Sequence, residues 1–265
     1  MDDTRYAMVL AAFGTTCVQE EKLILPIQKM LQQQRPDVDI FVAFTSPFVT
    51  ADKLEKGQTS KSLTQTLMTL PACGYTHVAV QSLHVVPGLE FDAVCDTTRH
   101  FAQTANTIQR VCTGYPLIHN DASVKRLARE LADDLPPERQ PGEAVVFVGH
   151  GTKHASGALL YPALQGYLWQ HDPSLFVGTL EGNLNTHAIL AMLRIQGLRK
   201  VWLVPLLACC GAHARQDIFG EKYSWQNSIE EGGLNGIPVE KALLERPGVA
   251  AMWVENAMVC LKNLE

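Results

Sequence analysis

The sequence predicts an α/β fold built from two similar, doubly wound, Rossmann-like domains with parallel sheets. Two observations lead to this prediction. Short apolar runs alternate with amphipathic stretches along nearly all of the 265 residues, as in chains that lay helices on both faces of a parallel sheet. The alternation also starts afresh after residue 144, and strand ends of the second half match those of the first.

The first half supplies three strand-like and three helix-like segments. The strand-like runs are short and apolar: 6–14, 39–46 and 77–86. The helix-like stretches have apolar residues at helical spacing: 22–34, 62–74 and 90–104. Since each helix-like stretch follows a strand, the segments form repeated βα units.

A proline-rich stretch separates the halves. Residues 131–144 contain three prolines and four acidic residues, which is typical of a connection between domains. We therefore expect an N-terminal domain over 1–135, a C-terminal domain with the metal site over 136–245, and a closing helix over 246–265. The segment 217–240 has four glycines and no clear period, and we expect a mobile or lid-like connection there.

The second half repeats the first in order. VLAAFGTT (9–16) lies over VFVGHGTK (146–153), and DIFVAFTSP (39–47) lies over SLFVGTLEG (174–182). HVAVQSLHVVPGLE (77–90) lies over KVWLVPLLACCGAH (200–213), with Gly88 opposite Gly211. Apolar strand ends resemble one another, so each match alone is weak. Their common order predicts a duplicated α/β unit.

Composition restricts the function classes. The net charge is −5 with a pI near 6.0 and no basic block, which argues against a nucleic-acid partner. No apolar run is long enough to span a bilayer, and the start of the chain shows no export signal, so we expect no membrane association. Seven cysteines without a CxxC pair favour a reducing compartment, and we expect a cytoplasmic protein.

Polar side chains gather at the predicted strand ends of the second half. In open parallel sheets, ligands bind beyond the carboxyl ends of the strands, and His150, Glu181 and His213 fall there. Imidazole nitrogen and carboxylate oxygen suit a divalent first-row metal, and three ligands leave coordination positions open. The competing interpretation is structural: a hydrogen-bonded His150, with Glu181 and His213 at helix N-termini.

Other candidate sites have less support. His84 either lines a cleft or is a core imidazole, and Glu90 either opens a helix or accepts protons. The chain has no GxxxxGK[ST] phosphate loop, no GxGxxG spacing and no GxSxG nucleophile elbow. A nucleotide site or a serine hydrolase is therefore poorly supported.

The motifs in combination resemble a known family. They are AAFGTT, AFTS, LHVVPGLEFD, VGHGT, GTLEGN and PLLACCGAHARQDIFGE. Together they are similar to the anaerobic cobalt chelatases of cobalamin synthesis, the CbiK type, which are class II chelatases. The resemblance covers essentially the whole chain. It implies a chelatase-type fold with a tetrapyrrole cleft between two domains, and ATP-independent insertion of Co²⁺ into sirohydrochlorin or precorrin-2.

The resemblance also implies roles for individual residues. His150 and His213 match the family's active-site histidines, Glu181 its metal-binding glutamate, and Glu90 a carboxylate that accepts protons. We further expect Phe13, His84, Gly151 and Thr152 to contact the substrate. The expected partners are sirohydrochlorin and a divalent metal, with no cofactor beyond the substrate Co²⁺, for which Fe²⁺ and Ni²⁺ are alternatives.

Three other functions use the same residues or the same fold. A sirohydrochlorin ferrochelatase that makes sirohaem would need the same ligands, because metal affinity order separates Co²⁺ from Fe²⁺ only weakly. A non-catalytic metal or tetrapyrrole carrier would bind without turnover. A two-domain sensor of the periplasmic-binding type would bind a small ligand without depending on metal.

Overall fold

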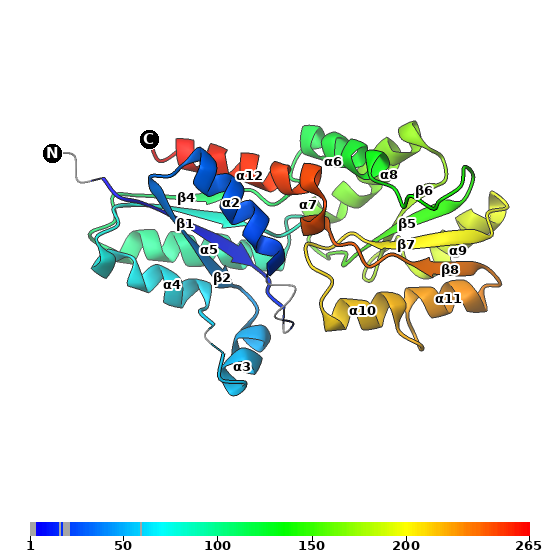
Figure 1. Cartoon of the computed structure of the whole chain (residues 1–265), viewed down its shortest axis with the longest axis horizontal. Helices are drawn as coiled ribbons and strands as arrows, with labels where there is room; N and C mark the ends of the chain where they lie inside the picture. Colours follow the sequence, from blue (N-terminus) through cyan, green and yellow to red (C-terminus); the bar gives the residue numbers. More distant parts are fainter. Residues whose placement is uncertain (1–3, 16, 18–21, 59) are drawn as a thin grey trace. The chain divides into compact units, whose positions relative to one another are not determined.

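The computed structural model describes residues 4–15, 17, 22–58 and 60–265, with Ala212 and His213 described by their backbone alone. The chain divides into two compact units (Figure 1). Unit 1 comprises residues 1–117 and 250–265, and unit 2 comprises residues 118–249. Within the described ranges, no helix combines the length and the hydropathy needed to cross a membrane.

Each unit alternates strands and helices. The helices and strands up to residue 117, where the chain passes from unit 1 to unit 2, are β1 (Tyr6–Ala12), α2 (Leu25–Gln34), β2 (Val38–Phe44), α3 (Pro47–Glu55), α4 (Leu63–Thr69), β3 (His77–Ser82), α5 (Leu89–Thr104) and β4 (Arg110–Gly114). Those that follow are α6 (Asp121–Asp133), β5 (Ala144–Gly149), α7 (Ala155–Ala158), α8 (Leu160–His171), β6 (Leu175–Thr179), α9 (Thr186–Ile195), β7 (Lys200–Pro205), α10 (Ala212–Phe219), α11 (Trp225–Glu231), β8 (Asn235–Pro238) and α12 (Pro247–Lys262).

Two parallel sheets with the same strand order form the cores. The first sheet runs β2-β1-β3-β4 and the second runs β6-β5-β7-β8, each of four strands. The central strands are buried along almost their whole length, because helices cover both faces of such sheets. Their Val, Leu and Ala residues supply the apolar surface whose burial stabilises the units. The predicted α/β class is confirmed.

The helices begin where their sequences supply caps. Ser62 and Gln65 form a capping box at the start of α4, in which each side chain bonds the other residue's backbone N–H. Asn120 and Ser123 do the same for α6. These local signals orient the helices so that their apolar residues face the sheets, as Leu67 of α4 does in the core of unit 1.

The backbone repeats in detail as well as in strand order. The N–H of Thr45 donates to the carbonyl of Ala12 at 2.8 Å, and at the matching place Leu180 donates to Gly149 at 2.9 Å. Leu83 likewise donates to Ala11 at 2.9 Å, which Leu206 repeats toward Val148 at 2.8 Å. Because the same hydrogen bonds join the same strand ends in both halves, the matched segments are structural equivalents.

The two halves each give their last helix to the other unit. Leu117 donates to the carbonyl of His84 at 2.9 Å, and Leu243 repeats this bond toward Leu207, also at 2.9 Å. After these equivalent positions the chain crosses, so α6 belongs to unit 2 and most of α12 belongs to unit 1. In unit 2, the hydroxyl of Tyr167 on α8 donates to Asp121 at the start of α6.

The chain passes from one unit to the other after residue 117 and again after residue 249, and not in the proline-rich stretch 131–144. The boundary expected at 135/136 lies inside unit 2, because α6 packs on α8 rather than on the sheet that precedes it. The closing helix is present, but it starts at Pro247 and belongs to unit 1 from residue 250 onward.

The expectation of a lid-like connection over 217–240 is wrong. That segment holds the end of α10, then α11 and β8, and β8 pairs in parallel with β7 from Lys200 to Leu203. The four residues NGIP of β8 contain glycine and proline, which local propensity excludes from strands. Strand β8 lies at the edge of its sheet and tolerates both residues. Pro238 has no backbone N–H, but at the end of an edge strand this removes no hydrogen bond to β7.

Candidate active site

His150 stands at the end of the central strand of unit 2. Strand β5 is fully buried to Gly149, and His150 is the first exposed residue after it. Tyr161 of α8 shapes this strand end: a Cβ on Gly149 would lie 2.8 Å from its ring, and its hydroxyl accepts from the N–H of Gly151 at 3.3 Å. The imidazole Nδ1 of His150 lies 3.4 Å from the carbonyl oxygen of Gly151. The strand thus presents an imidazole on a fixed backbone.

Glu181 adjoins His150 through the backbone. Its N–H donates to the carbonyl of His150 at 2.9 Å. Gly151 has a φ of +82°, and a Cβ there would lie only 2.0 Å from the carbonyl oxygen of Glu181. The close approach of the two chains therefore requires glycine. It brings the predicted imidazole and carboxylate to adjacent strand ends.

The loop that carries Glu181 is short and closed. The N–H of Thr179 donates to the carbonyl of Leu184 at 2.8 Å, and Glu181 is exposed within this loop. The helix that follows is capped by Asn185, whose side chain accepts from the N–H of Ala188. The alternative in which Glu181 caps that helix is therefore wrong, and its carboxylate is left for another role.

His213 is the second residue of α10. The helix follows β7 and has Gly211 as its N-cap, with no side-chain cap bond. The side chain of His213 lies outside the described part of the structure. Among the side chains that are described, no three His, Cys, Asp or Glu groups are gathered as a metal site. The convergence of His150, Glu181 and His213 on one ion stays a prediction.

The equivalent strand ends of unit 1 carry different residues. Phe13 occupies the place of His150, and the N–H of Ser46, in the place of Glu181, donates to the carbonyl of Phe13 at 3.1 Å. Ser46 caps α3 by accepting from Val49 at 3.4 Å. Glu90 is the second residue of α5 after its N-cap Gly88, as His213 is in α10. Its exposed carboxylate stabilises that helix end and remains open to solvent.

His84 belongs to a polar network at the end of β3. Its Nδ1 lies 2.8 Å from the hydroxyl of Ser82, and its Nε2 lies 3.4 Å from that of Thr45, which follows β2. Burial lowers the pKa of His84 to about 4, although the nearby carboxylate of Glu90 opposes this shift. The ring is therefore neutral near pH 7. Sequence reasoning selected His84 but not its two hydroxyl partners, because only the sheet brings Thr45 beside it.

Apolar side chains line the carboxyl edge of the first sheet. One follows each strand and is more than half exposed: Phe48 after β2 (73%), Phe13 after β1 (52%), Leu89 after β3 (71%) and Tyr115 after β4 (54%). Large exposed apolar groups that follow every strand of one sheet indicate a surface for an apolar ligand. We call these four residues the apolar edge.

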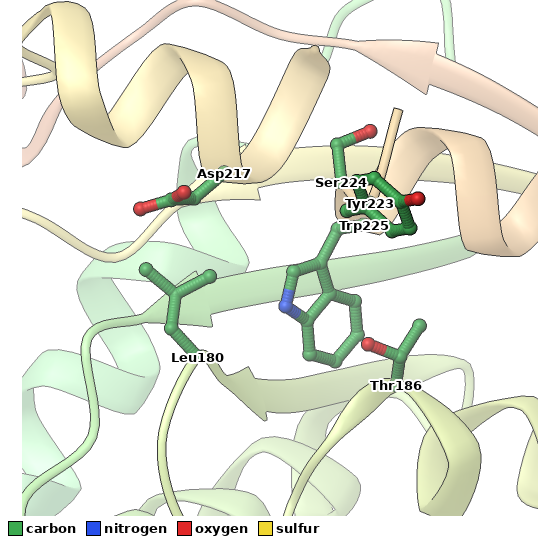
Figure 2. Close-up of a pocket in the computed structure, with 6 residues that line it drawn as sticks. All are labelled: Leu180, Thr186, Asp217, Tyr223, Ser224 and Trp225. Atoms are coloured by element: carbon green, nitrogen blue, oxygen red, sulfur yellow. The ribbon is translucent and has the colours of Figure 1, made fainter. Parts of the chain in front are cut away.

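A hollow opens beside the Glu181 loop in unit 2 (Figure 2). It encloses about 290 Å³, and among the described side chains its lining includes none of the predicted site residues: it consists of Leu180, Thr186, Asp217, Tyr223, Ser224 and Trp225. The Trp225 indole lies between Leu180 and Thr186, against Gly178, where a Cβ would lie 2.3 Å from the ring. The sequence analysis did not select this hollow, because Asp217 and Trp225 fall in the segment expected to be a lid.

Thr152, another predicted substrate contact, is half-buried in the turn after His150. Its hydroxyl accepts a hydrogen bond from the N–H of His154.

The fold of two parallel-sheet units is shared with a solved chelatase. SirB from Bacillus subtilis, solved with Fe³⁺, superposes with a TM-score of 0.70 over 98% of this chain and 97% of its own, at 13% identity. That likeness concerns the fold. The model of the family "Cobalt chelatase (CbiK)" matches residues 6–261, and the chain belongs to this family.

Two curated relatives agree with this assignment. The sirohydrochlorin cobaltochelatase CbiKC of Nitratidesulfovibrio vulgaris is 34% identical over 267 residues, which cover 99% of this chain and 93% of that protein. The sirohydrochlorin cobaltochelatase of Salmonella typhimurium is 31% identical over 256 residues, covering 94% of each. The predicted resemblance to cobalt chelatases is confirmed.

Proposed function

We propose that this protein is a sirohydrochlorin cobaltochelatase, which inserts Co²⁺ into the tetrapyrrole without ATP. The observation that carries the proposal is the backbone contact between His150 and Glu181, in a chain that matches the cobalt chelatase family over residues 6–261. Both residues are exposed and stand on adjacent strand ends. They supply the nitrogen and oxygen donors that Co²⁺ accepts.

Unit 2 holds the metal in this proposal. His150 and Glu181 bind the ion together with His213, the second residue of α10. Three protein ligands leave coordination positions for the pyrrole nitrogens that replace the metal's water. A rigid backbone at Gly151 favours transfer, because the donors keep their positions while the metal leaves.

Insertion also requires the loss of two pyrrole N–H protons. A histidine that has released the metal regains a free lone pair and accepts a proton, and we assign this step to His213. Glu90 takes or relays the second proton. Metal binding and proton acceptance compete for the same imidazole lone pair, so the rate falls when the histidines are protonated before metal arrives.

The apolar edge of unit 1 supports the substrate part of the proposal. A tetrapyrrole has a flat apolar ring, and Phe13, Phe48 and Tyr115 offer aromatic surface that follows three strands of one sheet. His84 is neutral beside this edge and offers a hydrogen-bonding group without adding charge. We also expect Gly151 and Thr152 to contact the substrate. The proposed partners are thus sirohydrochlorin and Co²⁺, with no resident cofactor, in a cytoplasmic enzyme.

An absorbance assay of sirohydrochlorin metallation tests the proposal. Co²⁺, Fe²⁺ and Ni²⁺ are supplied in parallel, and the expected result is many turnovers per chain with kcat/KM highest for Co²⁺. Product limited to one equivalent per chain would indicate a carrier, and faster insertion of Fe²⁺ would indicate a ferrochelatase. His171→Ala, an exposed histidine at the end of α8, is the matched control for variants of His150.

A further inference from the structure

The edge strand of unit 1 meets the end of the chain through one face. Positions 110, 112 and 114 of β4 lie on the same face of the strand, because strand residues two apart share a face. Arg110 donates to the carbonyl oxygen of Leu264 at 3.2 Å. All three positions thus face the last turns of α12 and the residues just after it.

Two thiols meet within this contact. The Asn263 amide lies 3.9 Å from the Cys112 sulfur, and a Cβ on Gly114 would lie 3.3 Å from the Cβ of Cys260. Cys260 and Asn263 are one turn apart in sequence, so both reach the same stretch of β4. The side chains of Cys112 and Cys260 also shift each other's pKa, which places the two sulfurs next to each other. Cys260 is buried and Cys112 is half-buried, so solvent reaches Cys112 more readily.

The two thiols differ in reactivity. The contact with Cys260 lowers the pKa of Cys112 to about 7, whereas the same contact and burial raise the pKa of Cys260. A thiol with a pKa near ambient pH attacks oxidants fastest, because it combines thiolate content with nucleophilicity. Cys112 therefore has the character of an attacking thiol and Cys260 that of its resolving partner.

We propose that Cys112 and Cys260 form a reversible disulfide that fastens α12 to β4 when a hydroperoxide is present. The Cys112 thiolate attacks the peroxide O–O bond, which gives a sulfenic acid and releases water or alcohol after proton uptake. The Cys260 thiol then displaces hydroxide from the sulfenic sulfur, and water leaves as the S–S bond forms. The peroxide is reduced by two electrons, and a dithiol later restores both thiols.

The positions of Cys112 and Cys260 in the chain explain why a disulfide between them would stabilise the protein. Cys112 precedes the first crossing of the chain and Cys260 follows the second, so all of unit 2, residues 118–249, lies between them. The disulfide closes this long loop at its base. It therefore lowers the conformational entropy of the unfolded chain and holds α12 on unit 1. The reduced protein relies for this contact on packing and hydrogen bonds such as that of Asn256 to the carbonyl of Pro116.

Peroxide treatment of the full chain tests the proposal. The purified reduced protein is exposed to hydrogen peroxide and digested without reductant, and a peptide linking Cys112 to Cys260 is expected by mass spectrometry. Two of the seven thiols should be lost and recovered with dithiothreitol. The unfolding midpoint should rise by at least about 3 °C in the oxidised form. Cys112→Ser should abolish both the disulfide-linked peptide and the rise in the unfolding midpoint. Cys73→Ser, a change at an exposed cysteine, should keep both.

Cys260→Ser gives a second signature. Without its resolving thiol, Cys112 should accumulate as a sulfenic acid that dimedone traps, whereas the wild-type protein should give little adduct. Oxidation of Cys112 in the wild type that stops at sulfinic acid would overturn the proposal, as would a link to a different cysteine. An oxidised protein with the link but an unchanged midpoint would refute the stabilising role.

Discussion

The carboxyl edges of the two sheets share a backbone and differ in chemistry. Equivalent hydrogen bonds hold Ser46 to Phe13 in unit 1 and Glu181 to His150 in unit 2. The first edge carries apolar side chains beside its serine, and the second carries an imidazole and a carboxylate. A duplicated framework has thus been filled with two side-chain sets, one suited to a flat apolar ring and one to a metal ion.

The difference teaches where function lies in this fold. The hydrogen bonds at the strand ends are nearly identical in length in both units, so they cannot account for the metal binding that we propose for one edge. Only the side chains that project from the shared positions can do so. Exchanging or removing these side chains is therefore the way to test the comparison.

Removal of a proposed metal ligand should have the largest effect. His150→Ala takes the imidazole from the end of β5, and kcat/KM for cobalt insertion should fall by at least about 100-fold, as for loss of a ligand or proton acceptor. Steady-state kinetics with sirohydrochlorin measure it. His213→Ala should show a loss of similar size, while the control His171→Ala stays near wild type. Wild-type rates in both His150→Ala and His213→Ala would contradict the proposal that the edge of the unit 2 sheet binds the metal.

The glycines that follow the central strands should differ in their tolerance of alanine. Gly151→Ala places a Cβ against the backbone of Glu181, whereas Gly14→Ala meets the ring of Phe44 at 2.9 Å, a side chain that can shift. Both positions have positive φ. We expect Gly151→Ala to lower the free energy of unfolding by about 3 kcal/mol and Gly14→Ala by about 1–2 kcal/mol. Urea unfolding measures both, and equal losses would contradict the tighter contact in unit 2.

Glu90 provides a smaller test, because it occupies in unit 1 the place that His213 occupies in unit 2. Glu90→Gln keeps the shape but cannot take up a proton, so kcat should fall by about tenfold while KM for Co²⁺ changes little. Glu230→Gln, on the exposed surface of α11, is the matched control. A large rise in the KM for Co²⁺ instead would assign Glu90 to metal binding.

The last test concerns pH and the polar network around His84 in unit 1. In the unfolded chain His84 should titrate near 6.5, whereas its folded pKa is about 4, so the unfolded state binds more protons between these values. Stability should therefore fall as the pH drops from 6.5 to 4, by on the order of 2–3 kcal/mol from this group. Comparing wild type with His84→Gln by urea unfolding isolates it. A constant difference between the two proteins across that range would refute the shift.

Much of the fold was predictable because its signals are local. Buried strands such as 6–12 and 144–149 appear as uninterrupted apolar runs, and the capping box at Ser62 and Gln65 marks a helix start. The repeat was visible because equivalent strand ends keep their order. By contrast, β8 has glycine and proline within four residues, and its strand character comes from pairing with β7.

The candidate site also contains features that the sequence predicted and features that it did not. Histidine and glutamate after apolar runs suggested the edge chemistry at His150 and Glu181 directly. The contact between Thr45 and His84 was not predictable, because Thr45 follows β2 and reaches His84 only after β2 and β3 have both paired with β1. The apolar edge was equally hidden: apart from Phe13, its residues are ordinary in sequence, and only the pairing of the four strands puts the strand ends that they follow in one sheet.

By itself, the sequence determined the strand and helix pattern, the internal repeat and the donor atoms placed after the strands of the second half. These depend on residues close together along the chain, where periodicity and capping act. The tertiary structure alone decided that α6 and α12 change units, that β8 completes a sheet, and that Cys112 meets Cys260. Such contacts join distant segments, and they form because burial of apolar surface and backbone pairing outweigh the local preferences of each segment.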